Sequence, residues 1–207
     1  MQRPSWLRAV SRVLAGLTLA ASLQIVQSGV VVAQTLPSEP NATDAAQRGS
    51  KLEALFAALK SAANDDESRE FVDEIWRIWN ASGNADVDAL MTQASKAMGF
   101  RDFGLAGRLL DEVVRQAPDF AEGWNRRATL RYLAGDHPGS LADIEKVLAL
   151  EPRHFGAMAG RGLIQFAAEQ WKDALAAFRK ALVLNPFLNE RHQLIPMLET
   201  LVEGEKL

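Results

Sequence analysis

The sequence of 207 residues contains no cysteine, one tyrosine and three histidines. The absence of cysteine excludes disulfides and thiolate metal sites, so the folded chain must be held together by its hydrophobic core. The histidines, His137, His154 and His192, stand far apart and show none of the spacings of metal ligands. Each lies beside an expected turn or helix end, where we expect it to act as a capping or turn residue. We therefore expect no metal site.

Catalytic motifs are also missing. The sequence has no glycine-rich phosphate loop, no nucleophile elbow and no HExxH pair. Its paired acidic residues, such as Asp111 and Glu112, fall near helix starts or on exposed faces, where solvation explains them. Because catalysis needs titratable groups that converge, we expect a protein that is not an enzyme and that has no cofactor.

Residues 1–33 have the order of a secretory signal peptide. Three arginines precede a long apolar run from Val13 to Val32, and small residues lead to a polar break at Gln34. We expect cleavage after Ala33 and export, to a bacterial periplasm in the first place and by secretion as the alternative. Polar residues and a glycine interrupt the apolar run, so a retained membrane anchor is the less favoured interpretation.

The acidic balance of the chain narrows the class of partner. Removal of residues 1–33 would take away three basic and no acidic residues, which leaves 20 basic and 26 acidic residues and a net charge near −6. This balance argues against nucleic acid and against an anionic membrane surface as the main partner. A protein or peptide is the partner we expect.

The mature chain begins with two unlike segments. Residues 34–49 hold two prolines and many small polar residues without apolar periodicity, which predicts a flexible linker. Residues 50–86 predict a pair of helices, the first capped by Ser50. The second helix carries Trp76 and Trp79 on an apolar face too wide for a helix covered on one side. We interpret the pair as a degenerate repeat with both tryptophans in the core, or alternatively as an exposed aromatic platform.

From Val87 onward the same residue types recur with a period of about 34 residues, a length typical of stacked helical repeats. The recurring positions are the prolines Pro118, Pro152 and Pro186 and the small residues Ala94, Ala128 and Gly162. In such an array each unit buries its apolar face against the next. The predicted units are 87–120, 121–154 and 155–188, and residues 189–207 predict a terminal helix that covers the last apolar face.

The second and third units resemble the tetratricopeptide repeat (TPR). The residues that carry the resemblance are Trp124, Ala128, Gly135, Pro152, Gly162, Ala174, Phe178, Ala181 and Pro186. The sequence departs from the family pattern where Arg131 and Gln165 replace the usual tyrosine and Ser140 replaces the usual alanine. The resemblance implies an all-α fold: a right-handed α-solenoid of helix-turn-helix repeats, with an N-terminal helical pair and a C-terminal capping helix.

In TPR arrays the first helices line a concave groove, so the resemblance also implies a binding surface for a protein or peptide. The residues expected to form it are Met91, Ser95, Met98, Asn125, Arg126, Thr129, Tyr132 and Phe166. Met98, Tyr132 and Phe166 follow one another at intervals of one period and could present an apolar stripe to a peptide, or equally fill space between paired helices. Asn125 and Arg126 could bind a peptide backbone or a carboxylate.

The basic clamp with which some TPR proteins hold C-terminal carboxylates is absent from this sequence. The corresponding positions are Met91, Ser95, Gly156 and Gly160. We therefore do not expect this chain to recognise the C-terminal tails of chaperones.

Two arginines on the first helices match across one period. Arg127 and Arg161 each face the partner helix of their unit, so we expect each to pair with an acid or a carbonyl inside the array. Taken together, these features predict a non-catalytic exported adaptor. The alternative is a structural module that self-associates, through the Trp-rich helices or the terminal helix.

Overall fold

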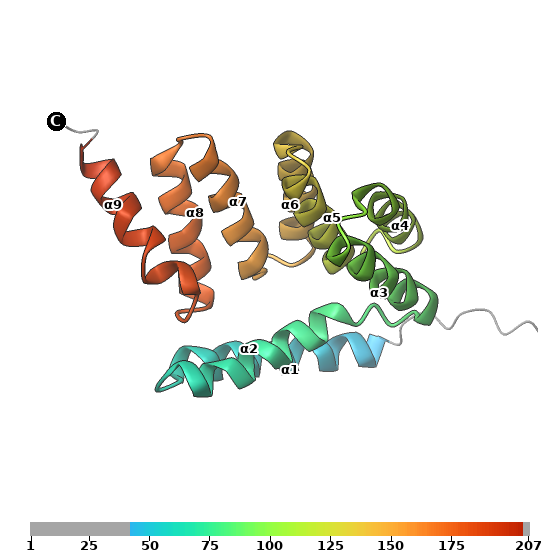
Figure 1. The fold of residues 1–207 in the computed structure, drawn as a ribbon. Helices are drawn as coiled ribbons and strands as arrows, with labels where there is room; N and C mark the ends of the chain where they lie inside the picture. Colours follow the sequence, from blue (N-terminus) through green and yellow to red (C-terminus); the bar gives the residue numbers. More distant parts are fainter. Residues whose placement is uncertain (1–41, 205–207) are drawn as a thin grey trace, which may run out of the picture. The chain divides into compact units, whose positions relative to one another are not determined.

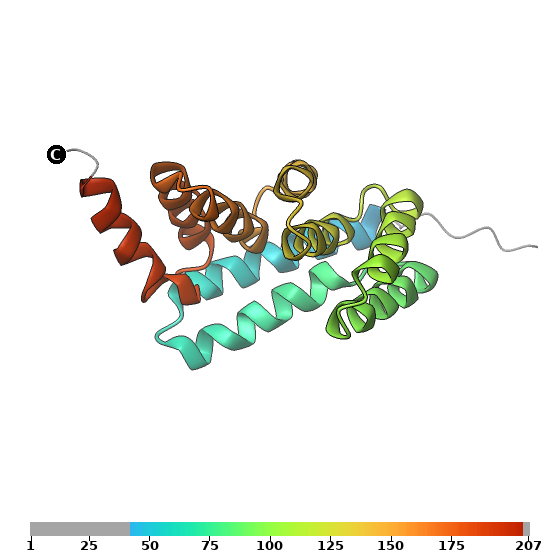
Figure 2. The same ribbon diagram turned by 45° about the horizontal axis from the view of Figure 1, so that its top comes forward.

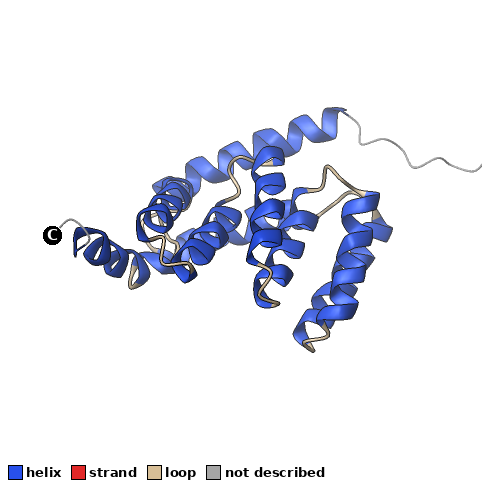
Figure 3. Cartoon of the chain, turned by 90° about the horizontal axis from the view of Figure 1, so that it is seen from above, coloured by secondary structure: helices blue, strands red, loops and turns tan. Residues whose placement is uncertain are grey.

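The computed structural model describes residues 42–204, with side chains from residue 45. The expected signal peptide, its cleavage site and the first half of the expected linker lie outside the described residues. Within them the fold is entirely helical, as the sequence predicted (Figure 1 and Figure 3). The α-helices are α1 (Ala42–Ser61), α2 (Asp65–Asn80), α3 (Ala85–Gly99), α4 (Phe103–Gln116), α5 (Ala121–Leu133), α6 (His137–Leu150), α7 (Phe155–Ala167), α8 (Trp171–Leu184) and α9 (Leu194–Gly204), and a short 3-10 helix, η1, spans Asn189–Arg191.

Helices α3 to α8 form pairs: α3 with α4, α5 with α6 and α7 with α8, here called the first, middle and last pair (Figure 1). Consecutive pairs meet where α4 packs on α5 and where α6 packs on α7. The second helices begin at Phe103, His137 and Trp171, positions separated by one period of the sequence. The period in the sequence is therefore the spacing of the helix pairs.

The turn inside each pair uses the same backbone conformation. Arg101, Gly135 and Glu169 have φ angles of 60°, 82° and 58°, the left-handed conformation that closes many helix C-termini. At each of them the backbone N–H donates to the carbonyl three residues earlier. Of the three, Gly135 alone adopts this conformation without a steric cost from a Cβ atom. The next residue, Asp102 or Asp136, caps the second helix of its pair.

A small residue on the first helix sets how closely a pair packs. In the last pair, a Cβ atom added to Gly162 would lie 2.8 Å from the ring of Phe178. In the middle pair the corresponding residue is Ala128, whose carbonyl accepts a hydrogen bond of 2.8 Å from the buried Ser140 hydroxyl. Ser140 can stand where alanine is usual because this hydrogen bond satisfies its hydroxyl group.

The expectation that Arg127 pairs inside the array is confirmed. Its guanidinium donates to both carboxylate oxygens of Asp143 in α6, at 2.8 and 2.9 Å, and to Asp111 in α4 at 2.8 Å. The hydrogen bonds to Asp143 are the main cause that raises the pKa of Arg127 above its ordinary value. Arg131 lies 2.9 Å from the same carboxylate, so Asp143 holds two arginines of α5 against α6.

The same expectation is wrong for Arg161 in the last pair. Arg161 forms no hydrogen bond and no ion pair within residues 42–204. Arg161 has no partner in this range because Ala177 stands at the position of α8 that corresponds to Asp143 of α6. The arginine recurs, but the carboxylate does not.

The N-terminal helices α1 and α2 pack on the last pair (Figure 2). Phe56 of α1 and Trp79 of α2 are buried in one core with Phe155 of α7 and Ala181 of α8. Trp79 also stacks on His154, with ring centroids 4.3 Å apart and an interplanar angle of 10°. Trp79 is therefore a core residue, whereas the idea that this segment is a degenerate repeat stays a prediction.

The expected linker is wrong in its second half. Helix α1 begins at Ala42, well before the expected cap at Ser50, so residues 42–49 are helical. These residues contain three alanines and no proline, a composition compatible with helix. In addition, Arg48 donates at 3.1 Å to the carbonyls of Ile78 and Ala81 at the end of α2. This contact with α2 stabilises the extra turns, and no apolar periodicity in the sequence announces it.

Helix α9 covers the outer side of the last pair. Its residues Ile195 and Leu198 are buried in one core with Leu175 and Phe178 of α8. Pro196 lies in the first turn of α9, where a missing backbone N–H costs no helical hydrogen bond. Between residues 42 and 204, no helix is both long and apolar enough to cross a membrane.

Candidate functional site: a groove between α2 and the first helices

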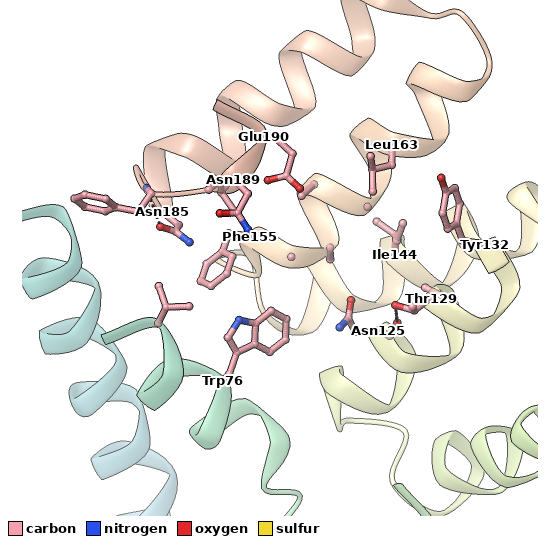
Figure 4. A pocket seen from close by; sticks show the side chains of 18 of the residues that line it. Trp76, Asn125, Thr129, Tyr132, Ile144, Phe155, Leu163, Asn185, Asn189 and Glu190 are labelled. Atoms are coloured by element: carbon pink, nitrogen blue, oxygen red, sulfur yellow. Dashed lines mark hydrogen bonds between the residues drawn. The ribbon is translucent and has the colours of Figure 1, made fainter. Parts of the chain in front are cut away.

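A groove of about 670 Å³ lies between α2 and the first helices of the middle and last pairs (Figure 4). Helix α2 contributes one wall, which includes Trp76, and helices α5 and α7 contribute the other. The segment 185–190, which follows α8, supplies further lining residues. The groove is therefore built from segments that are far apart in the sequence.

Glycines of α7 allow the two walls to approach each other. A Cβ atom at Gly156 would lie 2.8 Å from the Trp76 ring, so glycine is needed for the indole to sit there. A Cβ atom at Gly160 would meet only Ile144, at 3.7 Å, which is an ordinary contact. Helix α7 thus presents bare backbone to the groove at Gly160, while the Trp76 ring covers Gly156.

Polar side chains accompany this apolar surface. Asn125 and Thr129 lie one turn apart on α5, and the Thr129 hydroxyl donates to the Asn125 carbonyl at 3.0 Å. Figure 4 shows Asn125 and Trp76 on opposite walls. Other polar residues that line the groove include Asp65, Arg69, Asn189 and Glu190. Such a mixture of amides, a hydroxyl and apolar surface suits the backbone and small side chains of a peptide.

Behind the groove, a buried carboxylate and a buried histidine join α5 to α7. Glu122 and His154 are at most 1% exposed, and Glu122 Oε2 lies 3.3 Å from His154 Nε2. His154 Nδ1 accepts a hydrogen bond of 3.1 Å from the Ala157 N–H, which confirms the expected capping role. Because Nδ1 accepts, the ring hydrogen is placed on Nε2, and the neutral imidazole donates it to Glu122.

Arg126 belongs to this network and is not among the residues that line the groove. Its guanidinium donates to Glu122 at 3.0 Å, to the Ser95 hydroxyl at 2.8 Å and to the Asn80 side chain at 3.0 Å. The Asn125 amide donates to the second Glu122 oxygen at 2.8 Å. Arg126 thus links α2, α3 and α5. Its N–H groups, which we expected to bind a partner, are used in these internal hydrogen bonds.

Met98, Tyr132 and Phe166 do not line one common groove. Met98 packs against the core of the first pair. Tyr132 lines the groove and also stacks on His137, with ring centroids 5.5 Å apart. Phe166 packs on Trp171 at 5.3 Å. Tyr132 and Phe166 both contact the first residue of the following helix, as space-filling residues would. A role for the row in binding stays a prediction.

Of the other expected groove residues, Asn125 and Thr129 line the groove with Tyr132. Met91 is buried in the core of the first pair, and the Ser95 hydroxyl donates to the Met91 carbonyl at 2.9 Å. The structure therefore concentrates the site on α5 and α7 and leaves the first pair outside it.

Sequence reasoning did not place α2 or the segment 185–190 in this site. The signal available was the wide apolar face of the helix that carries Trp76. That face indicates that the helix is covered on more than one side, but it does not say which helix covers it. Only the packing of α2 beside α7 reveals the wall.

The geometry of the groove suits binding. Within residues 42–204, no group of three or more His, Cys, Asp or Glu side chains is placed to hold a metal ion. The pair of His154 and Glu122 is buried, so a ligand in the groove cannot reach it. What the groove can supply is shape, amide groups and apolar contact.

Comparison with known proteins gives the family. No protein-family model matches the chain. A TPR repeat-containing protein of Rhizobium etli is 36% identical over 156 residues, which cover 75% of this chain and 76% of that protein. The solved TPR domain of Sgt2 from Aspergillus fumigatus is similar with a TM-score of 0.55 at 20% identity, over 59% of this chain and 83% of that domain.

A second solved structure, the first TPR of Spaghetti (RPAP3) bound to an HSP90 peptide, has a TM-score of 0.54 at 16% identity, over 56% of this chain and 93% of that chain. At such identities the two structures show a shared fold and nothing more. The Rhizobium protein is similar in sequence over most of both chains, and the helix pairs of this chain repeat with one constant period. The chain therefore belongs to the TPR repeat-containing proteins.

Proposed function

We propose that the protein is a non-catalytic adaptor that binds an extended peptide segment of a partner protein in the groove between α2, α5 and α7. The observation that carries this proposal is the groove itself, about 670 Å³ in volume, with glycine backbone on α7 and the Asn125 and Thr129 side chains on α5. The Spaghetti TPR, which shares the fold, was solved with a bound peptide.

The groove favours a peptide with small or apolar side chains over one held by its C-terminal carboxylate. Trp76 and Leu163 supply apolar contact on the two walls, and Gly160 leaves room for a backbone. The side-chain amides of Asn125 and Asn189 can pair with peptide groups that would otherwise lose their hydrogen bonds to water. In this proposal the peptide is recognised along its length.

Filling the groove tests the proposal. Peptides selected on the protein by display are titrated by calorimetry against Gly160→Leu, which adds bulk at a glycine that lines the groove and whose Cβ atom would meet only Ile144, at 3.7 Å. We expect the dissociation constant to rise about tenfold or more, a loss of about 1.4 kcal/mol or more. Gly104→Leu on α4, where the added Cβ atom also has only ordinary contacts, is the matched control and should bind as the native chain does.

Two outcomes would contradict the proposal. Equal affinity for Gly160→Leu and Gly104→Leu would move the site away from this groove. If no peptide binds and the protein sediments as oligomers that grow with concentration, self-association would replace peptide binding as the function.

We further propose that residues 1–33 direct export and are removed after Ala33. The support is the order of charged, apolar and small residues in that segment. Mass spectrometry of the protein from its native host should find a chain that begins at Gln34 in the periplasmic or secreted fraction. An intact N-terminus in the membrane fraction would show a retained anchor instead.

A further inference from the structure

A second groove lies on the other side of the last pair. It has a volume of about 370 Å³ and lies between the end of α6, α7 and α8. Its apolar lining comes from Leu148, Pro152 and Met158, and its polar lining includes Arg161 and Gln165. This Arg161 groove shares no lining residue with the groove of the proposed function.

In the middle pair, a carboxylate occupies the position that corresponds to this groove. There, Arg127 and Arg131, one turn apart on α5, both contact the Asp143 carboxylate of α6. The Asp143 side chain is 3% exposed, and the Arg127 side chain is 14% exposed. The carboxylate thus occupies a nearly dry position between the two helices, where a bidentate arginine contact is strongest.

In the last pair the same helix positions lack the carboxylate. Helices α7 and α8 begin one period after α5 and α6, so Arg161 corresponds to Arg127 and Ala177 corresponds to Asp143. Arg161 is half-buried and forms no hydrogen bond or ion pair with any residue that the structure describes.

A second polar residue of α7, one turn after Arg161, also lacks a hydrogen-bond partner in the described part of the chain. Gln165 corresponds to Arg131, and its Oε1 atom is buried without a hydrogen-bond partner among the described residues. A buried polar atom of this kind costs free energy unless a ligand or water satisfies it. Within residues 42–204 the groove is therefore bordered by an unpaired donor, the Arg161 guanidinium, and by an unpaired acceptor, Gln165 Oε1, which needs an N–H or O–H donor and not a carboxylate.

The remaining charges leave the groove positive. Asp173 and Lys180 also line it, and their formal charges offset each other. Glu145 of α6 corresponds to Asp111 of α4, which Arg127 contacts, but Glu145 is exposed and forms no ion pair with Arg161. The uncompensated charge is that of Arg161.

We propose that the Arg161 groove binds an aspartate or glutamate side chain of a partner protein, which takes the place that Asp143 fills in the middle pair. The carboxylate accepts from the Arg161 guanidinium, while the flanking apolar residues of the partner contact Leu148, Pro152 and Met158. Because this site lies outside the groove of the proposed function, it adds a second contact surface.

The test uses the blocked tripeptide acetyl-Leu-Asp-Leu-amide as probe, with acetyl-Leu-Asn-Leu-amide as its uncharged match. Both are titrated into the isotope-labelled protein while the backbone amide NMR signals of Met158 and Gln165, which line the groove, are followed. We expect a saturable shift with the aspartate peptide, and binding at least about tenfold weaker for the asparagine peptide and for Arg161→Gln. Gly160→Leu, which fills the other groove, should leave this binding unchanged.

A second variant restores the missing group within the chain. Ala177→Asp places a carboxylate where Asp143 stands one period earlier, so it should abolish the peptide shift and raise the melting temperature above that of Ala177→Asn. Should Ala177→Asp fail to fold, Arg161→Gln decides alone. Absence of a saturable shift, or equal shifts in Arg161→Gln and the native chain, would overturn the proposal.

Discussion

At the scale of single residues, the buried charges of the array are stable because each has an assigned partner. Asp143 is nearly inaccessible and contacts both Arg127 and Arg131, whereas the pair of Arg179 and Glu199 is exposed on both sides, at 59% and 44%. Removing one member of a buried pair leaves the other charge without compensation, but an exposed charge is solvated by water. The two kinds of pair should therefore respond differently to mutation.

We expect Asp143→Ala to lower the free energy of unfolding by about 3–5 kcal/mol, because it removes the buried carboxylate that Arg127 and Arg131 share. Glu199→Ala, which removes an exposed partner, should change it by about 0.5 kcal/mol or less. Urea unfolding monitored by circular dichroism measures both. Similar small losses in the two variants would show that the Asp143 cluster contributes little.

The pH dependence of stability should contain a contribution from Glu151. Burial raises the pKa of this carboxyl, but hydrogen bonds from the Arg153 side chain and backbone outweigh burial and bring the pKa below its ordinary value. A depressed folded-state pKa stabilises the protein above the unfolded pKa, and that contribution is lost as the pH falls through the folded pKa. Between pH 6 and pH 3 the native chain should lose more unfolding free energy than Glu151→Gln.

Glu74 provides the comparison for this measurement. Its hydrogen bonds to Arg77 and then Lys51 lower its pKa to about 2, a large shift. Its partners are exposed, so solvent screens the interaction and Glu74→Gln should alter the pH profile little. A larger effect from Glu74→Gln than from Glu151→Gln would contradict the ranking by burial.

At the scale of elements, two of the three glycines of α7, Gly160 and Gly162, lie in different environments. The added Cβ atom would meet Ile144 at 3.7 Å at Gly160 but the Phe178 ring at 2.8 Å at Gly162. Phe178 is fully buried, so the ring has little freedom to move away. Alanine at position 160 is therefore compatible with the packing of α7, whereas alanine at position 162 is not.

We expect Gly160→Ala to stabilise the protein by about 0.5–1 kcal/mol, because alanine loses less conformational freedom in a helix than glycine does. Gly162→Ala should instead destabilise it by about 1–3 kcal/mol through overpacking against Phe178. Differential scanning calorimetry of the two variants checks the opposite signs. Stabilisation by both substitutions would mean that α7 and α8 can move apart at no cost.

At the scale of the whole described fold, α1 and α2 are held by contacts with the last pair that are distant in sequence. Trp79 is central to them, because it contacts Phe56 of α1 as well as His154 and Phe155 at the start of α7. The same attachment forms one wall of the groove. Loss of this contact should loosen the N-terminal helices and open the groove together.

We expect Trp79→Ala to cost about 3–5 kcal/mol of local stability, the usual loss for a buried tryptophan. Hydrogen exchange should rise in α1, α2 and the first turn of α7, while α3 and α4 keep their protection. Trp79→Phe, which retains an aromatic ring, should lose less protection. A uniform rise over all helices would show that the N-terminal pair and the array unfold as one unit.

The sequence alone determined the helix pairs and their spacing. Their recurring prolines and small residues act on neighbouring turns and helices, so the constant period is sufficient to place α4, α6 and α8. It also predicted the pairing of Arg127 and the capping by His154, since both depend on contacts within a pair or at one helix end.

Tertiary structure decided where α1 and α2 lie, which residues line the groove and that Arg161 has no partner within the described residues. Apolar attraction is not directional, so the wide face of α2 could be covered by any apolar surface in reach. Its place beside Gly156 follows from shape, because there the absence of a side chain admits the Trp76 ring. Local sequence periodicity does not indicate a contact between residues that are far apart in the sequence.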